Sequence, residues 1–192
     1  MINPNAVLNA GVRNKVPPVA GRFYTNCNAV VTFSAASVSA LQRRTAFFEP
    51  LADMTIDQIG VFLTVAPAAA ARIKLAVYEF DAVNPAQLDL VHEFAEITTD
   101  TTIGAKMASA NFTFLAGRFY VFVHHSDTAL TYRNLPASAA PAAVLPTIDA
   151  TIPAAYWFLG SVPYSATAAP TLDTSAMTPF ASNPTLILMR AA

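Results

Sequence analysis

The chain has 192 residues, 11 lysines and arginines against 12 aspartates and glutamates, and a single cysteine. This length predicts one domain whose core is large enough to need neither disulfide nor metal. Hydrophobic residues make up 54% of the chain and charged residues only 12%, which excludes intrinsic disorder. The net charge of −1 excludes a generally nucleic-acid-binding surface. So few charges also predict a surface that is shared with partners.

Charge is distributed unevenly along the chain. Residues 1–44 hold five basic residues and no acid, whereas residues 45–192 hold six basic and twelve acidic ones, a net −6. Residues 1–18 lack periodicity and are predicted to be an extended basic arm that precedes a single domain at 19–192. Such arms often become ordered against a partner; a frayed tail with solvated charges is the plainer alternative. The predicted partner-binding basic residues are Arg13, Lys15, Arg22, Arg43 and Arg44.

Neither a signal peptide nor a membrane span is expected from this sequence. Residues 1–15 contain four asparagines and a proline and have no apolar segment of the kind that a signal peptide needs. The longest uncharged stretches, 134–148 and 150–172, are broken repeatedly by proline. We therefore expect no membrane partner.

The first element of the domain is ambiguous. Ala35, Val38 and Leu41 lie at helical spacing, so one short helix within residues 34–44 is as well favoured as none. Alanine favours a helix there, but the serines of the segment do not.

The middle of the chain alternates apolar and polar side chains with a period of two, as half-buried strands do. Turn-forming residues separate these runs, and no amphipathic helix of crossover length intervenes, which predicts antiparallel pairing. In the last run both faces are mostly apolar, which predicts a central strand or one pressed against another subunit. The predicted strands lie within residues 54–65, 72–80, 88–95, 111–114 and 119–124.

The last third of the chain is rich in proline, with eight of the 14 prolines between residues 136 and 184. Long helices and long central strands are excluded there. Short apolar runs at 143–145, 156–159 and 186–189 predict short strands joined by turns. The fold prediction is all-β: an antiparallel, jelly-roll-like β-sandwich of about eight short strands.

One pentapeptide, Ala-Gly-Arg-Phe-Tyr, occurs twice, at residues 20–24 and 116–120. The flanking sequences differ, so the repeat does not indicate a duplicated module. A glycine that opens a turn and an aromatic pair that enters a strand account for both copies. We therefore predict that each copy begins a strand.

No pattern predicts catalysis, a cofactor or a metal site. His124 and His125 are adjacent, so on a strand they point to opposite faces and cannot grip one ion. Cys27 has no thiol-enzyme motif around it and is predicted to be a small buried hydrophobe. The acid pairs Glu79/Asp81 and Glu93/Glu96 are best explained by a charged, solvated sheet face. Tyr156 and Trp157 are predicted to pack in the core or to anchor a subunit contact.

Four runs of sequence together resemble a pattern common in virion proteins of tailed bacteriophages. They are Phe47–Pro50, Thr55–Val61, Arg72–Tyr78 and Leu115–Val121, and they span about two fifths of the chain. The resemblance implies a jelly-roll β-sandwich found in tail fibres and in small accessory proteins of virions, often as trimers. The family's glycine-rich loop after the third run is here Asp81-Ala82-Val83-Asn84-Pro85, without glycine.

The resemblance implies a non-enzymatic structural protein of the virion. The favoured hypothesis is a trimeric capsid decoration or cement protein whose basic arm lies on the shell, with the major capsid protein as partner. The alternative is a tail-fibre or tail-tip protein that binds host glycans on aromatics such as Trp157. Length favours decoration, because the chain has neither shaft repeats nor heptads. An enzyme acting on polysaccharide, with Glu79 and Asp81 as its acids, is the least favoured hypothesis.

Overall fold

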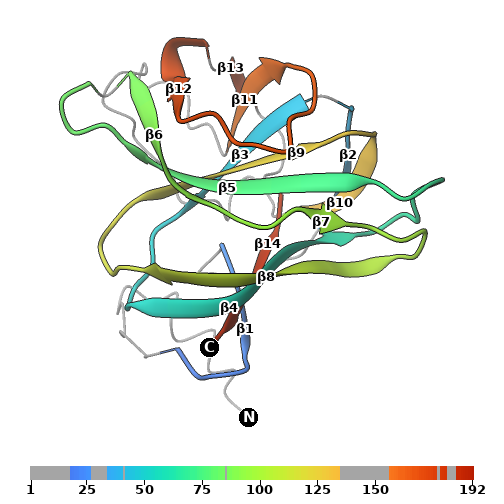
Figure 1. Ribbon diagram of the computed structural model, residues 1–192, viewed down its shortest axis with the longest axis horizontal. Coiled ribbons are helices and arrows are strands. Elements are labelled where there is room, and N and C mark those ends of the chain that lie inside the picture. The colour runs from blue at the N-terminus through green and yellow to red at the C-terminus, as the bar shows by residue number, and fades with distance from the viewer. Residues whose placement is uncertain are drawn as a thin grey trace.

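The computed structural model describes residues 18–26, 34–40, 42–84, 86–134, 156–176, 178–180 and 185–192. They form an all-β sandwich of two antiparallel sheets (Figure 1). The only helical element among them is one 3₁₀ turn, η2 (Thr174–Ala176). Within these ranges no helix has the length and apolar character to cross a membrane. The all-β prediction is confirmed.

The first sheet, sheet A, has six strands. It consists of β1 (Phe23–Thr25), β2 (Ser34–Val38), β4 (Met54–Leu63), β8 (Gly104–Phe114), β10 (Leu130–Asn134) and β14 (Ile187–Ala191). The order is β1-β14-β4-β10-β2, with β8 paired to the other edge of β4. The chain's last strand is therefore held between the first strand and β4, and joins the two ends of the described domain.

The second sheet, sheet B, has eight strands. It consists of β3 (Gln42–Phe48), β5 (Arg72–Phe80), β6 (Gln87–Glu93), β7 (Ile97–Thr98), β9 (Tyr120–Ser126), β11 (Tyr156–Ser161), β12 (Thr171–Asp173) and β13 (Thr178–Phe180). The order is β12-β6-β5-β9-β3-β11-β13, and β7 pairs with the first two residues of β5. β9 lies at the centre with apolar residues on both faces, as predicted.

The main core fills the space between the sheets. The inward side of β4 supplies Ile59 and Val61, which have no exposed surface, and β5 supplies Ile73 and Leu75 from the other sheet. Phe114 of β8 lies at the centre of an aromatic cluster and contacts the rings of Phe48, Tyr120 and Phe122 at centroid distances of 5.2, 5.0 and 5.6 Å. These edge-to-face or tilted contacts are the arrangements that aromatic rings prefer.

One open alternative is decided and one prediction needs correction. Residues 34–40 and 42–44 form no helix; they contain β2 and the start of β3, which pair with β10 and β9 in different sheets. The described residues also hold fourteen strand segments rather than about eight. Several extra strands have only two or three residues, too few to carry a periodic signal, and they are strands only because a neighbour pairs with them. The run at 143–145 and Cys27 lie outside the described residues.

The repeated pentapeptide folds twice into the same turn. Gly21 and Gly117 both have a φ of 75°, which suits glycine at the third position of a type II turn. The closing hydrogen bonds run from Arg22 N to Val19 O, 3.1 Å, and from Arg118 N to Leu115 O, 3.3 Å. Each copy then enters a strand, β1 or β9, as predicted.

The tyrosine that ends each copy locks its turn. The Tyr24 hydroxyl accepts a hydrogen bond from Val19 N at 2.8 Å, and the Tyr120 hydroxyl accepts one from Leu115 N at 3.0 Å. Each bond joins two residues that are five positions apart. The same pentapeptide therefore has the same local structure in both sheets. Because Tyr120 is 2% exposed, its ring is also a core residue, whereas Tyr24 is half-buried.

Removing the two hydroxyl groups should have unequal effects. Tyr120→Phe leaves the partly buried amide of Leu115 without its acceptor, so we expect a loss of about 1–2 kcal/mol in the free energy of unfolding. Tyr24→Phe should cost less than about half of that, because water can reach the exposed amide of Val19. Urea unfolding of both variants measures the difference, and equal losses would contradict this explanation.

Candidate partner-binding surface

The predicted partner-binding residues fall into two separate places. Arg22 is exposed in the turn before β1, in sheet A. Arg43 is half-buried on β3, which pairs with the backbone of β11, the strand that contains Tyr156 and Trp157. β1 and β11 lie at opposite ends of the molecule (Figure 1). The assignment of Tyr156 and Trp157 to core or interface stays a prediction, as does the role of Arg13 and Lys15, which lie outside the described residues.

Arg44 does not project from the surface. It is 8% exposed and lies on the inward face of β3 with Ala46 and Phe48, where its Nη2 donates to Ser37 O at 3.3 Å. The alternation along β3 assigns it there, since it is two residues from Ala46 and four from Phe48. The sequence already shows this alternation, but Arg44 was predicted to bind a partner because it is basic. A guanidinium so enclosed offers little surface to a partner.

His124 lies opposite Arg44 across the β3–β9 ladder and is 1% exposed. Its Nε2 is 2.7 Å from the hydroxyl of Thr185. Burial lowers the pKa of His124 from 6.5 to about 3, and the charge of Arg44 acts in the same direction. The imidazole is therefore neutral at physiological pH. His124 is thus a neutral, buried ring with a threonine hydroxyl as its neighbour.

The outer face of sheet B is covered by the chain itself. The covering segment, residues 162–170, is tied to the sheet by four hydrogen bonds. They are Tyr164 OH to Glu96 Oε2, Ala168 N to Glu93 Oε2, Tyr78 OH to Ala169 O and Leu90 N to Pro170 O. Beneath the segment, Tyr78, Val121 and Leu172 belong to a second apolar cluster. Sequence reasoning missed this layer, because its anchors are 68 to 91 residues away from their partners along the chain.

The acids considered for catalysis have structural partners. Glu79 accepts two hydrogen bonds from Arg118 Nη1 at 3.3 and 3.2 Å. Asp81 Oδ1 accepts the amides of Val83 and Asn84 at 2.7 and 2.6 Å, which shapes the turn between β5 and β6. Glu93 pairs with Lys74, whose Nζ also donates to Phe94 O at 3.0 Å. Each of these three acids therefore has a partner within the chain.

Asp127 and His125 also have partners within the chain. Asp127 bonds both the backbone amide and the Nε of Arg72, at 2.9 and 2.8 Å. The ring of His125 lies 5.3 Å from that of Tyr164, in the network that holds the covering segment. Among the described residues, no three histidine, cysteine, aspartate or glutamate side chains converge on a point that could hold an ion.

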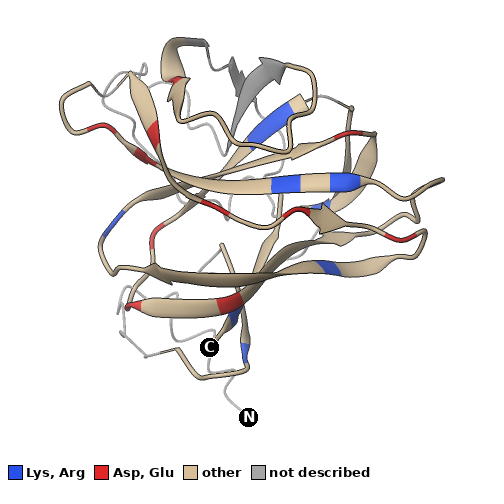
Figure 2. Cartoon of the chain, viewed as in Figure 1, with Lys and Arg blue, Asp and Glu red and all other residues tan. Residues whose placement is uncertain are grey.

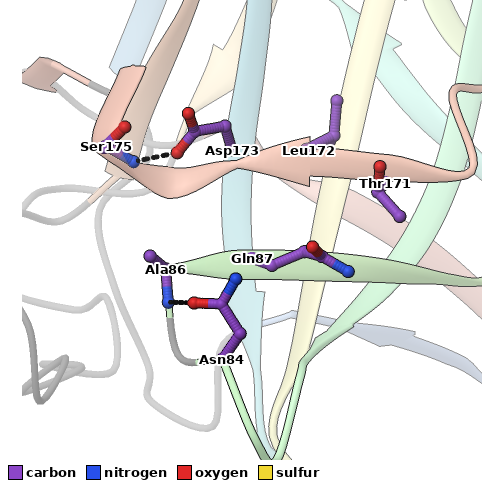
Figure 3. A pocket seen from close by; sticks show the side chains of 7 residues that line it. All are labelled: Asn84, Ala86, Gln87, Thr171, Leu172, Asp173 and Ser175. Carbon is purple, nitrogen blue, oxygen red and sulfur yellow. Dashed lines mark hydrogen bonds between the residues drawn. The ribbon is translucent and has the colours of Figure 1, made fainter.

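The described residues line at least two surface hollows. The first, of about 390 Å³, lies between β6 and β12 and is lined by Asn84, Ala86, Gln87, Thr171, Leu172, Asp173 and Ser175 (Figure 3). Its polar groups are used locally: Asn84 Oδ1 accepts from Ala86 N at 3.2 Å, and Asp173 Oδ1 accepts from Ser175 N at 2.8 Å. The second, of about 420 Å³, lies beside β4, where the Arg133 guanidinium is 3.9 Å from the centre of the Phe62 ring.

The outer face of sheet A contrasts with that of sheet B. We call the outward side of β8, β4 and β14 the open face; it includes Thr55, Asp57, Gly60, Phe62, Ala105, Met107, Ser109, Asn111, Thr113, Leu188 and Arg190. Five of these residues are exposed: Thr55, Ala105, Ser109, Asn111 and Thr113. β4 contains one acidic residue, and β8 contains one basic residue (Figure 2).

The open face neutralises its own charge. Asp57 and Arg190 form a bidentate pair, with Nε to Oδ1 at 2.8 Å and Nη2 to Oδ2 at 2.7 Å, which lowers the pKa of the carboxyl. The five exposed side chains of the open face are alanine, serine, threonine and asparagine. The face therefore presents small uncharged side chains, and its one acid and one base are paired with each other; unpaired charge is depleted at the centre of protein interfaces.

Comparison with known protein families finds no match for this chain. Comparison with curated proteins finds none either.

Proposed function

We propose that the protein is a non-enzymatic structural protein of a phage virion, a trimeric capsid decoration or cement protein that binds the outer shell. The observation that carries the proposal is the difference between the two faces of the sandwich. One face is closed by residues 162–170, whereas the open face has exposed small side chains and a self-paired charge. The jelly-roll topology that the sequence resemblance implies is part of this proposal.

Two further observations support a binding role over catalysis. The acids and histidines that chemistry would need are held by Arg118, Lys74, Tyr164 and Thr185 inside the chain. The chain's charge of −1 and its 12% charged residues also leave a surface with little electrostatic repulsion between copies. Contact between the open face and the shell would bury it as a standard interface does, about 800 Å² from each partner.

The test is the copy number of the protein in purified particles of the virus that encodes it, measured by mass spectrometry against the major shell protein. Decoration predicts a number comparable to that of the shell protein. A few copies per particle would place it at the tail or at a vertex and would favour the receptor-binding alternative. Its absence from the particles would overturn the virion proposal.

A pair of variants tests the open face. Ser109→Glu places an unpaired charge at its centre, so we expect the particle-bound fraction to fall at least about tenfold. Val83→Glu adds the same charge in the β5–β6 turn, where the side chain is 93% exposed, and should leave binding unchanged. Equal binding by the two variants would show that the open face does not contact the shell.

A further inference from the structure

The two copies of the repeated pentapeptide share one backbone structure but have different surroundings. In the second copy, Arg118 forms its ion pair with Glu79, 3.2 Å away. Phe119 packs against Phe47 and Phe80 at ring-centroid distances of 5.4 and 6.2 Å. The chain therefore surrounds the second copy's Arg-Phe dipeptide with a carboxylate and aromatic rings.

The first copy has no such surroundings. Phe23 is 57% exposed and is the only aromatic residue among the exposed large hydrophobic side chains of the described residues. Arg22 is exposed, and no described residue forms an ion pair with its guanidinium. The turn that presents these two side chains is fixed by the hydrogen bond from Val19 to Tyr24 and by one from Gly21 N to Ala191 O at 2.8 Å. A single exposed phenylalanine is ordinary by itself. Phe23 differs because the same dipeptide, in the same local turn of the second copy, is enclosed by partners.

We propose that Arg22 and Phe23 bind a segment of a partner protein that presents a carboxylate next to an aromatic ring. The second copy supplies the template: Glu79 and Phe80 are consecutive residues that contact Arg118 and Phe119 respectively. Arginine pairs well with carboxylates, and an aromatic beside an arginine is the composition typical of interface anchors. Phe23 pairs in register with Arg190 of the open face, so this site continues the surface proposed to face the shell.

The chain cannot supply the complementary group from its remaining sequence. Residues 1–17 contain neither an acid nor an aromatic, residues 27–33 contain only Phe33, and residues 135–155 contain only Asp149. A second copy is equally unsuitable: of the phenylalanines and tyrosines next to an acid in its sequence, Phe48, Tyr78 and Phe94 are at most 4% exposed, and Phe80 packs against Phe119. The occupant is therefore a different protein. That this partner is the shell protein rests on the proposed function. That the partner presents a carboxylate next to an aromatic ring does not rest on it.

The test is an NMR titration of the full chain with the tetrapeptide acetyl-Tyr-Glu-Phe-Asp-amide, which copies residues 78–81. We expect saturable shifts at residues 21–24 with a dissociation constant in about the millimolar range. No shifts should occur at residues 117–119, because that copy is already occupied. Replacing the peptide's glutamate by glutamine should weaken binding about tenfold, since the charge-assisted pair is lost.

Variants locate the contact. Arg22→Ala and Phe23→Ala should each abolish the shifts, and because both side chains are exposed neither change should unfold the protein. Arg72→Ala removes the same charge beside sheet B and should bind the peptide normally. An absence of saturation, binding that persists in Arg22→Ala, or an affinity for the glutamine peptide equal to that for the glutamate peptide would overturn the inference. The copy number in particles is an independent result, so failure here is distinguishable from failure of the proposed function.

Discussion

Gly60→Ala is expected to lower the free energy of unfolding by about 3 kcal/mol or more. Gly60 lies in the middle of β4, and a methyl group there would meet the carbonyl oxygen of Lys106 at 2.0 Å and the sulfur of Met107 at 2.6 Å. The oxygen belongs to the backbone of β8, so it cannot move without shifting that strand away from β4. Denaturant unfolding measures the loss.

A second substitution separates the two clashes. Met107→Ala removes the sulfur but leaves the Lys106 carbonyl in place, so adding it to Gly60→Ala should restore little stability. Recovery of most of the lost stability in the double variant would show that the side chain, and not the backbone of β8, excludes a larger residue. A loss of less than about 1 kcal/mol in Gly60→Ala itself would show that the two strands separate easily.

Acidification from about pH 7.5 to about pH 5 is expected to lower the free energy of unfolding by about 2 kcal/mol, chiefly through His124. Burial lowers the pKa of His124 from 6.5 to about 3. Below pH 6.5 the unfolded chain therefore takes up a proton that the folded protein does not accept until about pH 3. Stability falls over this window as pH falls. Thermal or urea unfolding at several pH values measures it.

His124→Gln is the matched control, because an amide can still bond the Thr185 hydroxyl but does not titrate. The variant should be less stable at pH 7.5, yet most of the loss between pH 7.5 and pH 5 should disappear. His92 adds a smaller effect of the same sign, since partial burial lowers its pKa as well. The carboxyls with lowered pKa values, such as Glu93 and Asp127, lose their contributions only at lower pH. An unchanged pH dependence in His124→Gln would contradict this assignment.

Much of the fold was predictable because its strands carry their own periodic signal. Ile73, Leu75 and Val77 alternate with more polar residues, and β5 begins and ends where the pattern predicts. The pentapeptide was predictable for a related reason: its glycine, its turn and its tyrosine lie within six residues. Local hydrogen bonds of this kind form in the same way wherever the sequence occurs.

The surroundings of those elements were not predictable in the same way. Arg22 and Arg118 belong to identical pentapeptides, but only Arg118 meets an acid, and that acid is 39 residues away along the chain. Arg44 was predicted to bind a partner although the alternation of β3 turns it inward. Residues 162–170 have no periodicity, and their anchors on Glu93 and Glu96 arise only from the way the sheet is assembled.

The sequence alone therefore determined the all-β class, most central strands and the two tyrosine-locked turns, because these depend on residues that are neighbours along the chain. Only the tertiary structure decided which sheet face is covered, which arginine is buried and which copy of the pentapeptide is left open. Those outcomes depend on pairing between distant strands, such as β3 with β9 and β1 with β14. No short run of residues specifies the partner of a strand, because many strands present the same backbone donors and acceptors.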